Sequence, residues 1–148
     1  MSLRLATKAD AAALAEVHAT AFDRPWTGDD ILRFAEDRGG FAIAAEDDGA
    51  LSGFILCRAM AGEAEILTLA VRPSQRRRGV ARALVEAAAA LAARTVDAMF
   101  LEVAEDNPGA VALYETTGFS AVGRRGAYYA RTGAPAVAAI VMRRALNS

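Results

Sequence analysis

Short runs of alternating apolar and polar residues predict seven strands in this chain. The alternation has a period of two, and glycine, proline or aspartate residues bound most of the runs. A tight hairpin turn, "DDGA" at 47–50, joins the second run to the third. The predicted strands span residues 3–7, 39–46, 51–59, 63–73, 97–106, 120–131 and 135–146.

Four other segments have apolar residues at helical spacing. Thr27 stands three residues before Asp30, as in a capping box, and marks the start of the second helix. The last helix has Asn107 as a suitable N-cap, Pro108 at its first position and Gly118 just past its end. The helical segments are 10–22, 24–37, 80–94 and 107–119.

The order of these elements is strand, two helices, three strands, helix, strand, helix and two strands. Such an order predicts an α/β (α+β) fold in which a mostly antiparallel, mixed sheet of about seven strands is flanked by about four helices. The chain has 148 residues and contains no repeat or linker. We therefore expect residues 1–148 to form one domain.

Charge and cysteine content narrow the classes of function. The chain has seventeen basic and eighteen acidic residues, and its net charge of −1 argues against a nucleic-acid binder. The single cysteine, Cys57, has no internal disulfide partner and fits a reducing compartment. Neither a signal peptide nor a membrane span is recognisable, so we expect a cytoplasmic protein without a membrane partner.

The segment "SQRRRGVAR" at 74–82 lies between a predicted strand and a predicted helix. The first turn of a helix offers unpaired N–H groups and a partial positive charge, and Gly79 lets the backbone approach a bulky anion. A Walker A loop is excluded because no Gly-Lys pair occurs, and a dinucleotide fingerprint because its other glycines are missing. A phosphate-binding nest and a solvated basic turn both remain open from spacing alone.

Two residues in the second half of the chain suggest proton transfer. In the strand at 97–106, Glu102 lies on the face opposite Leu101 and Val103, either in the interior of the sheet, where burial would raise its pKa, or at a solvated edge. Tyr114 lies on the apolar stripe of the last helix, as a core residue or as a phenol that protonates a leaving thiolate. With a phosphate nest, these two residues suggest acyl transfer from coenzyme A.

The segments "EAEILTLAVRPSQRRRGVARALVEAA" and "FLEVAEDNPGAVALYETTGF" resemble the acetyl-CoA and catalytic segments of the GNAT family of N-acetyltransferases. The Leu-Glu-Val, Asn and Ala-Leu-Tyr-Glu residues are most similar to the RimI type, which acetylates the N-terminal alanine of ribosomal proteins. The likeness extends to "AFDRPWT" near the start and "RRGAYY" near the end. It implies direct acetyl transfer to an amine, with acetyl-CoA as co-substrate and no metal.

The resemblance also implies site residues. Glu102 acts as base and Tyr114 as acid, and Asn107 contacts the cofactor. A backbone N–H near Leu69 stabilises the oxyanion. The backbone of Leu69, Ala70 and Val71 meets the pantetheine arm, and the pyrophosphate is held by the loop Arg76, Arg77, Arg78, Gly79, Val80, Ala81 and Arg82.

The acceptor is less constrained than the donor. The acidic pair common in RimI-type chains is replaced here by Val137 and Ala138, so a small amine is an alternative acceptor to a ribosomal-protein N-terminus. A non-catalytic acetyl-CoA-binding module is a further alternative. We expect a monomer that binds no nucleic acid directly. The aromatic residues Trp26, Tyr128 and Tyr129 either line the acceptor groove or belong to the core. The acidic residues Glu36, Asp37 and Glu63 either attract a basic tail or are merely solvated. His18, the only histidine, is expected at the surface or in packing, without a catalytic part.

Overall fold

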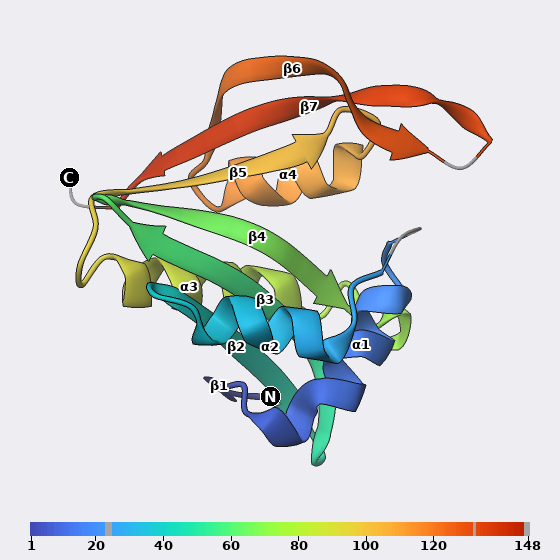
Figure 1. Ribbon diagram of the computed structural model, residues 1–148, viewed down its shortest axis with the longest axis vertical. Helices are drawn as coiled ribbons and strands as arrows, with labels where there is room; N and C mark the ends of the chain where they lie inside the picture. The colour runs from blue at the N-terminus through green and yellow to red at the C-terminus, as the bar shows by residue number, and fades with distance from the viewer. Residues whose placement is uncertain (23–24, 132, 147–148) are drawn as a thin grey trace.

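The computed structural model describes residues 1–22, 25–131 and 133–146 (Figure 1). The segment "AFDRPWT" at 21–27, part of the family likeness, includes residues 23 and 24, which lie outside the described ranges. The strands are β1 (Ser2–Leu5), β2 (Gly40–Asp47), β3 (Ala50–Met60), β4 (Glu63–Val71), β5 (Ala98–Ala104), β6 (Ser120–Arg131) and β7 (Ala134–Ala145). The helices are α1 (Ala11–Ala19), α2 (Gly28–Glu36), α3 (Val80–Ala92) and α4 (Pro108–Thr116), with short 3-10 turns at Lys8–Asp10 and Pro73–Gln75.

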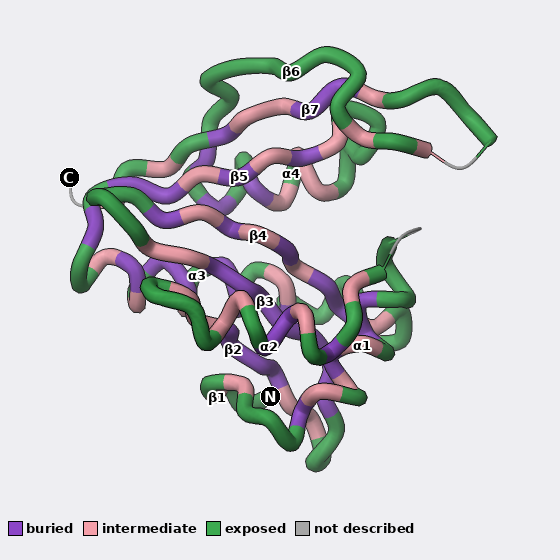
Figure 2. Tube along the Cα trace, viewed as in Figure 1, coloured by how far each residue is buried: buried purple, intermediate pink, exposed green. Residues whose placement is uncertain are grey.

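All seven strands form one sheet in the order β1-β2-β3-β4-β5-β7-β6. Neighbouring strands are antiparallel except β4 and β5, which are parallel and joined through α3. The prediction of a mixed, mostly antiparallel sheet of seven strands with four helices is confirmed. β6 forms one edge, and Figure 2 shows it exposed along most of its length.

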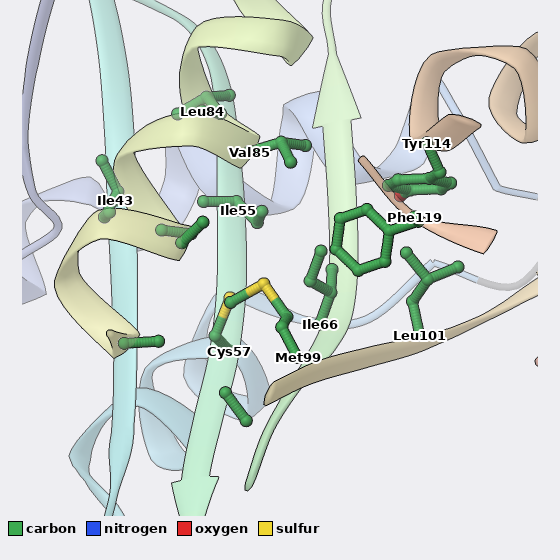
Figure 3. Packing of buried hydrophobic residues seen from close by; sticks show 14 of the residues in the cluster. Ile43, Ile55, Cys57, Ile66, Leu84, Val85, Met99, Leu101, Tyr114 and Phe119 are labelled. Atoms are coloured by element: carbon green, nitrogen blue, oxygen red, sulfur yellow. The ribbon is translucent and has the colours of Figure 1, made fainter. Parts of the chain in front are cut away.

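Helices cover both faces of the sheet. On one face, α1 and α2 pack on β2–β4 around a core that includes Leu14, Ile31 and Phe54. On the other face, α3 and α4 enclose a larger core, in which Leu84 and Val85 lie with residues of β3–β5 (Figure 3). Among the described residues, no helix is long and apolar enough to cross a lipid bilayer.

The helix boundaries follow the local signals in the sequence. The Thr27 hydroxyl accepts a hydrogen bond from the Asp30 N–H at 3.1 Å, as a capping residue of α2 should. Asn107 Oδ1 accepts the Ala110 N–H at 3.2 Å, and Pro108 is the first residue of α4. Gly118 has a φ of 95°, the left-handed conformation that ends a helix. The predicted caps of α2 and α4 are confirmed.

An opening between β4 and β5 is the feature of the fold that creates the site. The two strands pair only from Glu63 to Ile66 on β4 and from Ala98 to Leu101 on β5, and then diverge (Figure 1). Leu67 is the extra residue of a β-bulge against β3, because Leu56 pairs with Thr68 and Cys57 with Ile66. A bulge bends its strand and increases the local twist, which turns β4 away from β5.

Candidate active site

A cavity of about 740 Å³ lies at the opening between β4 and β5. Its walls come from five parts of the chain that are far apart in the sequence. The residues that line it are 66–69 of β4, 101–104 of β5, Asn107, Ala110 and Tyr114 at α4, 128–131 of β6, and His18, Ala21, Phe22 and Trp26 around the end of α1. The cavity thus brings together four of the catalytic and cofactor residues that the family resemblance implies, namely Leu69, Glu102, Asn107 and Tyr114.

Glu102 enters the cavity from the interior of the sheet, since β5 lies between β4 and β7. Its side chain is 21% exposed, and Oε1 accepts a hydrogen bond from Arg125 Nη1 at 2.6 Å. Oε2 receives no hydrogen bond from any residue in the described ranges. The Glu102 carbonyl accepts the Tyr129 hydroxyl at 2.9 Å, which ties β6 to the same residue. The carboxylate is therefore held from one side and open to the cavity from the other.

Tyr114 reaches the same cavity from the opposite face of the sheet. Its ring is 8% exposed and packs edge-on against Phe119, with 5.7 Å between centroids (Figure 3). Burial raises the pKa of the phenol well above 10, with a smaller contribution from Cys57. The hydroxyl therefore stays protonated at neutral pH. A phenol that keeps its proton and lines the cavity has that proton available for a leaving group there.

The predicted cofactor residues divide into two groups. Leu69 and Asn107 line the cavity, and Asn107 also caps α4. Ala70 and Val71 are buried residues at the end of β4, and residues 76–82 follow beyond them, outside the cavity wall. A ligand that reached from the cavity to this loop would therefore run along the last three residues of β4.

The loop before α3 has the backbone shape of an anion nest. Arg77 has a φ of 63° and Gly79 a φ of 79°, so two residues in close succession are left-handed. A Cβ built on Gly79 would meet no atom of the described chain within 4 Å. Arg76 Nε donates to the Val71 carbonyl at 3.1 Å, which fixes the loop to the end of β4. The first turn of α3, whose N–H groups have no partner within the helix, thus begins beside the open space around Gly79, as a phosphate site requires.

Aromatic residues contribute to the cavity wall from two separate parts of the chain. Trp26, Tyr128 and Tyr129 all line the cavity, as the groove interpretation expects, and Tyr128 is 46% exposed, whereas Trp26 also packs against the core under α1 and α2. Phe22, which the sequence did not single out, joins them. The Arg125 guanidinium lies 4.0 Å from the centroid of the Tyr128 ring, a cation–π distance.

Three arginines of β6 reach across β7 to carboxylates at the end of β5. Arg124 Nη2 lies 3.0 Å from Glu105, Arg125 pairs with Glu102, and Arg131 Nη2 lies 2.8 Å from Asp106. The ion pair holds the pKa of Asp106 below its usual value. The three ion pairs fix β6 along the rim of the cavity. Sequence alone did not find them, because the partners are 19 to 25 residues apart.

His18 and Thr68 also line the cavity, and neither was predicted from the sequence as a site residue. Of the two expectations for His18, surface or packing, the structure shows packing. The residue is 2% exposed and lines the cavity. Its Nε2 lies 3.2 Å from Thr68 Oγ1. Cys57 is fully buried on β3, and burial raises the pKa of its thiol. A buried thiol of this kind is inert, as is typical of a structural cysteine.

The acidic residues considered for a basic tail lie elsewhere. Glu63 lines a second, shallower groove of about 390 Å³, which shares Leu101 and Glu102 with the main cavity. Glu36 and Asp37, at the C-terminal end of α2, line neither of the two. The main cavity therefore has Glu102 as its one acidic lining residue among those the structure describes.

The chain belongs to the GNAT acetyltransferase family, whose model matches residues 11–119. It is an acetyl-CoA-dependent N-acetyltransferase. It is 35% identical to N-alpha-acetyltransferase RimI of Mycobacterium tuberculosis (strain ATCC 25618 / H37Rv) over 136 residues, which are 88% of this chain and 85% of the relative. It is 36% identical to the ribosomal protein bS18-alanine N-acetyltransferase of Escherichia coli (strain K12) over 86 residues, 57% of this chain and 58% of that one.

A solved structure extends the likeness over the whole fold. The crystal structure of the ribosomal-protein-S18-alanine N-acetyltransferase from Escherichia coli superposes with a TM-score of 0.91 at 26% identity. The match covers 99% of this chain and 94% of that one. The family and RimI-type resemblance predicted from the sequence is thereby confirmed.

Proposed function

We propose that the chain acetylates the N-terminal amine of a protein, with the N-terminal alanine of a small-subunit ribosomal protein as acceptor. One observation carries the chemistry: Glu102 and Tyr114, on opposite faces of the sheet, reach one cavity where β4 and β5 diverge. The acceptor is supported by the two relatives named for N-terminal or ribosomal-protein acetylation.

Acetyl-CoA fits the shape and charge of the region. Its diphosphate matches the left-handed residues Arg77 and Gly79 and the open amides at the start of α3. The open edge of β4, with Leu69, Ala70 and Val71, is suited to strand-like hydrogen bonds with the pantetheine arm. We propose from the family resemblance that Arg76, Arg78, Val80, Ala81 and Arg82 surround the diphosphate and that Asn107 contacts the cofactor.

The residues divide the proton transfers between them. Glu102, through a water at its open Oε2, removes a proton from the acceptor ammonium. The amine nitrogen then bonds to the acetyl carbon while the carbon–sulfur bond breaks, and Tyr114 gives its proton to the departing thiolate. The acylated nitrogen releases its second proton, which passes through water to the Tyr114 phenolate and restores the phenol. A backbone N–H beside Leu69 stabilises the charge that develops on the carbonyl oxygen. No acyl-enzyme is formed, and the thiol of buried Cys57 takes no part.

A small-amine acceptor is the second candidate. Val137 and Ala138 replace the acidic pair of RimI-type chains, and Ala138 is 6% exposed with its carbonyl bound to the Glu105 N–H at 2.8 Å. This site therefore offers no charge there to a basic peptide. A non-catalytic acetyl-CoA-binding module, the third alternative from the sequence, does not fit membership of a family of acetyltransferases.

An acceptor panel with acetyl-CoA separates the three. We expect rapid acetylation of a basic peptide that begins with alanine and none of the same peptide with a blocked N-terminus. Rapid turnover of a polyamine, amino acid or aminoglycoside, with none of the peptide, would favour the second candidate. Binding of acetyl-CoA without turnover of any acceptor would favour the third. In cells, mass spectrometry of small-subunit ribosomal proteins with and without the protein should show the loss of one N-terminal acetyl group.

We further propose that residues 1–148 act as a single domain, as a monomer and in the cytoplasm, without direct contact to nucleic acid. The single sheet of the described residues and the net charge of −1 support this. Strong, salt-sensitive affinity for RNA or DNA would contradict the last point.

A further inference from the structure

A buried histidine organises one wall of the cavity. The ring of His18 stacks with Phe22 and with Trp26, at centroid distances of 4.3 and 5.3 Å. Its Nδ1 lies 3.0 Å from the backbone nitrogen of Trp26, and its Nε2 lies 3.2 Å from Thr68 Oγ1. One imidazole thus connects the segment before α2 to the bulged part of β4.

The directions of these two hydrogen bonds follow from their chemistry. A backbone N–H can only donate, so Nδ1 of His18 accepts from Trp26 and carries no hydrogen. Burial lowers the pKa of His18 to about 4, so the ring is neutral at neutral pH and its one hydrogen is on Nε2. Nε2–H therefore donates to Thr68 Oγ1.

This leaves the hydroxyl hydrogen of Thr68 for another partner. Thr68 is 7% exposed and lines the cavity, and its oxygen makes no second hydrogen bond to a residue of the described ranges. A buried hydroxyl normally satisfies its donor. Since the oxygen already accepts from His18, the remaining hydrogen is directed into the cavity.

Thr68 faces Glu102 across the opening of the sheet. On β4 it follows Leu67, the extra residue of the bulge, and the last pair before the opening joins Ile66 to Leu101. Thr68 contacts His18 on the α1 face. Glu102 points to that same face, since its neighbours Leu101 and Val103 belong to the core under α3 and α4. The hydroxyl and the carboxylate thus border the same side of the cavity.

We propose that Thr68 binds the acceptor, donating a hydrogen bond to the carbonyl oxygen next to the reacting amine, and that His18 is the positioning residue that sets the direction of this donor. The inference rests on the proposed function, in which the acceptor is an α-amino acyl group. In such a group the carbonyl oxygen lies about 3 Å from the amine nitrogen. An amine held at Glu102 would present that oxygen to the opposite strand. A plain alkylamine has no such oxygen and gains nothing from Thr68.

Two small probes of matched shape test the proposal, alaninamide and isopropylamine, each with acetyl-CoA. Thr68→Val keeps the shape of the side chain and removes the donor. We expect kcat/KM for alaninamide to fall about tenfold, the effect of one lost hydrogen bond, and kcat/KM for isopropylamine to change less than about twofold. Because the two probes are compared on the same variant, any loss of stability cancels. Thr68→Ser restores the donor and should recover the preference for alaninamide.

His18→Leu tests the positioning role. The Thr68 hydroxyl can then rotate, and we expect the alaninamide preference to fall about threefold with the KM for acetyl-CoA unchanged. An unchanged preference in Thr68→Val, or an equal loss for both probes, would overturn the proposal. Failure of the proposed function has a separate signature: wild-type protein would acetylate alaninamide but not an alanine-starting peptide.

Discussion

Arg125 Nη1 donates a 2.6 Å hydrogen bond to Oε1 of Glu102, and the same guanidinium lies over the Tyr128 ring. The arginine is 52% exposed, whereas its carboxylate partner is 21% exposed. A partly buried carboxylate on an inner strand is therefore held by a cation from the edge strand. The contact leaves Oε2 facing the cavity, which suits a base that acts through water.

Removal of this contact should slow catalysis without preventing folding. In Arg125→Gln we expect kcat to fall about fivefold to tenfold, because the Glu102 carboxylate loses the charge-assisted hydrogen bond that orients it. The matched control is Arg124→Gln, since Arg124 pairs with Glu105, which does not line the cavity. Equal kcat values for the two variants would show that Arg125 does not orient the base.

Gly79 provides a test of the phosphate nest. Gly79→Ala should destabilise the fold by about 1–2 kcal/mol, because the position is left-handed. Gly62→Ala should cost a similar amount, since Gly62 has a φ of 86° and also has open space around its Cβ position. Only Gly79→Ala should raise the KM for acetyl-CoA, about fivefold or more, because its methyl group would lie between the amides and the anion. A similar KM in both variants would remove support for the nest.

His18 gives the stability of the fold a defined pH dependence. Its pKa is about 4 in the folded chain, against 6.5 in a model peptide. Between these values the unfolded chain binds a proton that the folded chain does not, so the free energy of unfolding falls as pH drops from 6.5 to 4, by up to about 3 kcal/mol. Denaturant unfolding at a series of pH values measures this.

The variant His18→Leu should lack that decline. Asp10 titrates in a different pH range, because hydrogen bonds from Arg4 lower its pKa to about 2. Its contribution to the free energy of unfolding is lost only as the pH falls from about 4 toward 2. A decline of equal size in wild type and His18→Leu would assign the effect to other groups.

Much of the fold was predictable because its signals are local. Asn107 and Gly118 determine the two ends of α4 through contacts within one helical turn. The alternation of apolar and polar residues around Glu102 determines on which face of β5 its side chain lies, whichever strands β5 pairs with. The bulge at Leu67 was not predictable, since it depends on register against β3. The opening of the sheet, and with it the cavity, depends on the pairing of β4 with β5 and was not predicted.

The site was predictable where a residue type matched a reaction and unpredictable where a partner came from tertiary structure. Glu102 and Tyr114 were identified as acid–base candidates from their strand and helix positions. Arg125 is 23 residues from Glu102, and the contact between them was not predicted. His18 lies 50 residues from Thr68, and nothing near it in the sequence indicates that it would be buried.

The most direct test of the acid–base pair is the kcat of Glu102→Gln and Tyr114→Phe, each with its affinity for coenzyme A measured by thermal shift. We expect kcat to fall about 10²- to 10⁴-fold in each variant. Coenzyme A at 100 times its dissociation constant should still stabilise both by about 2.7 kcal/mol. Wild-type turnover in both variants would contradict the assignment of these two residues.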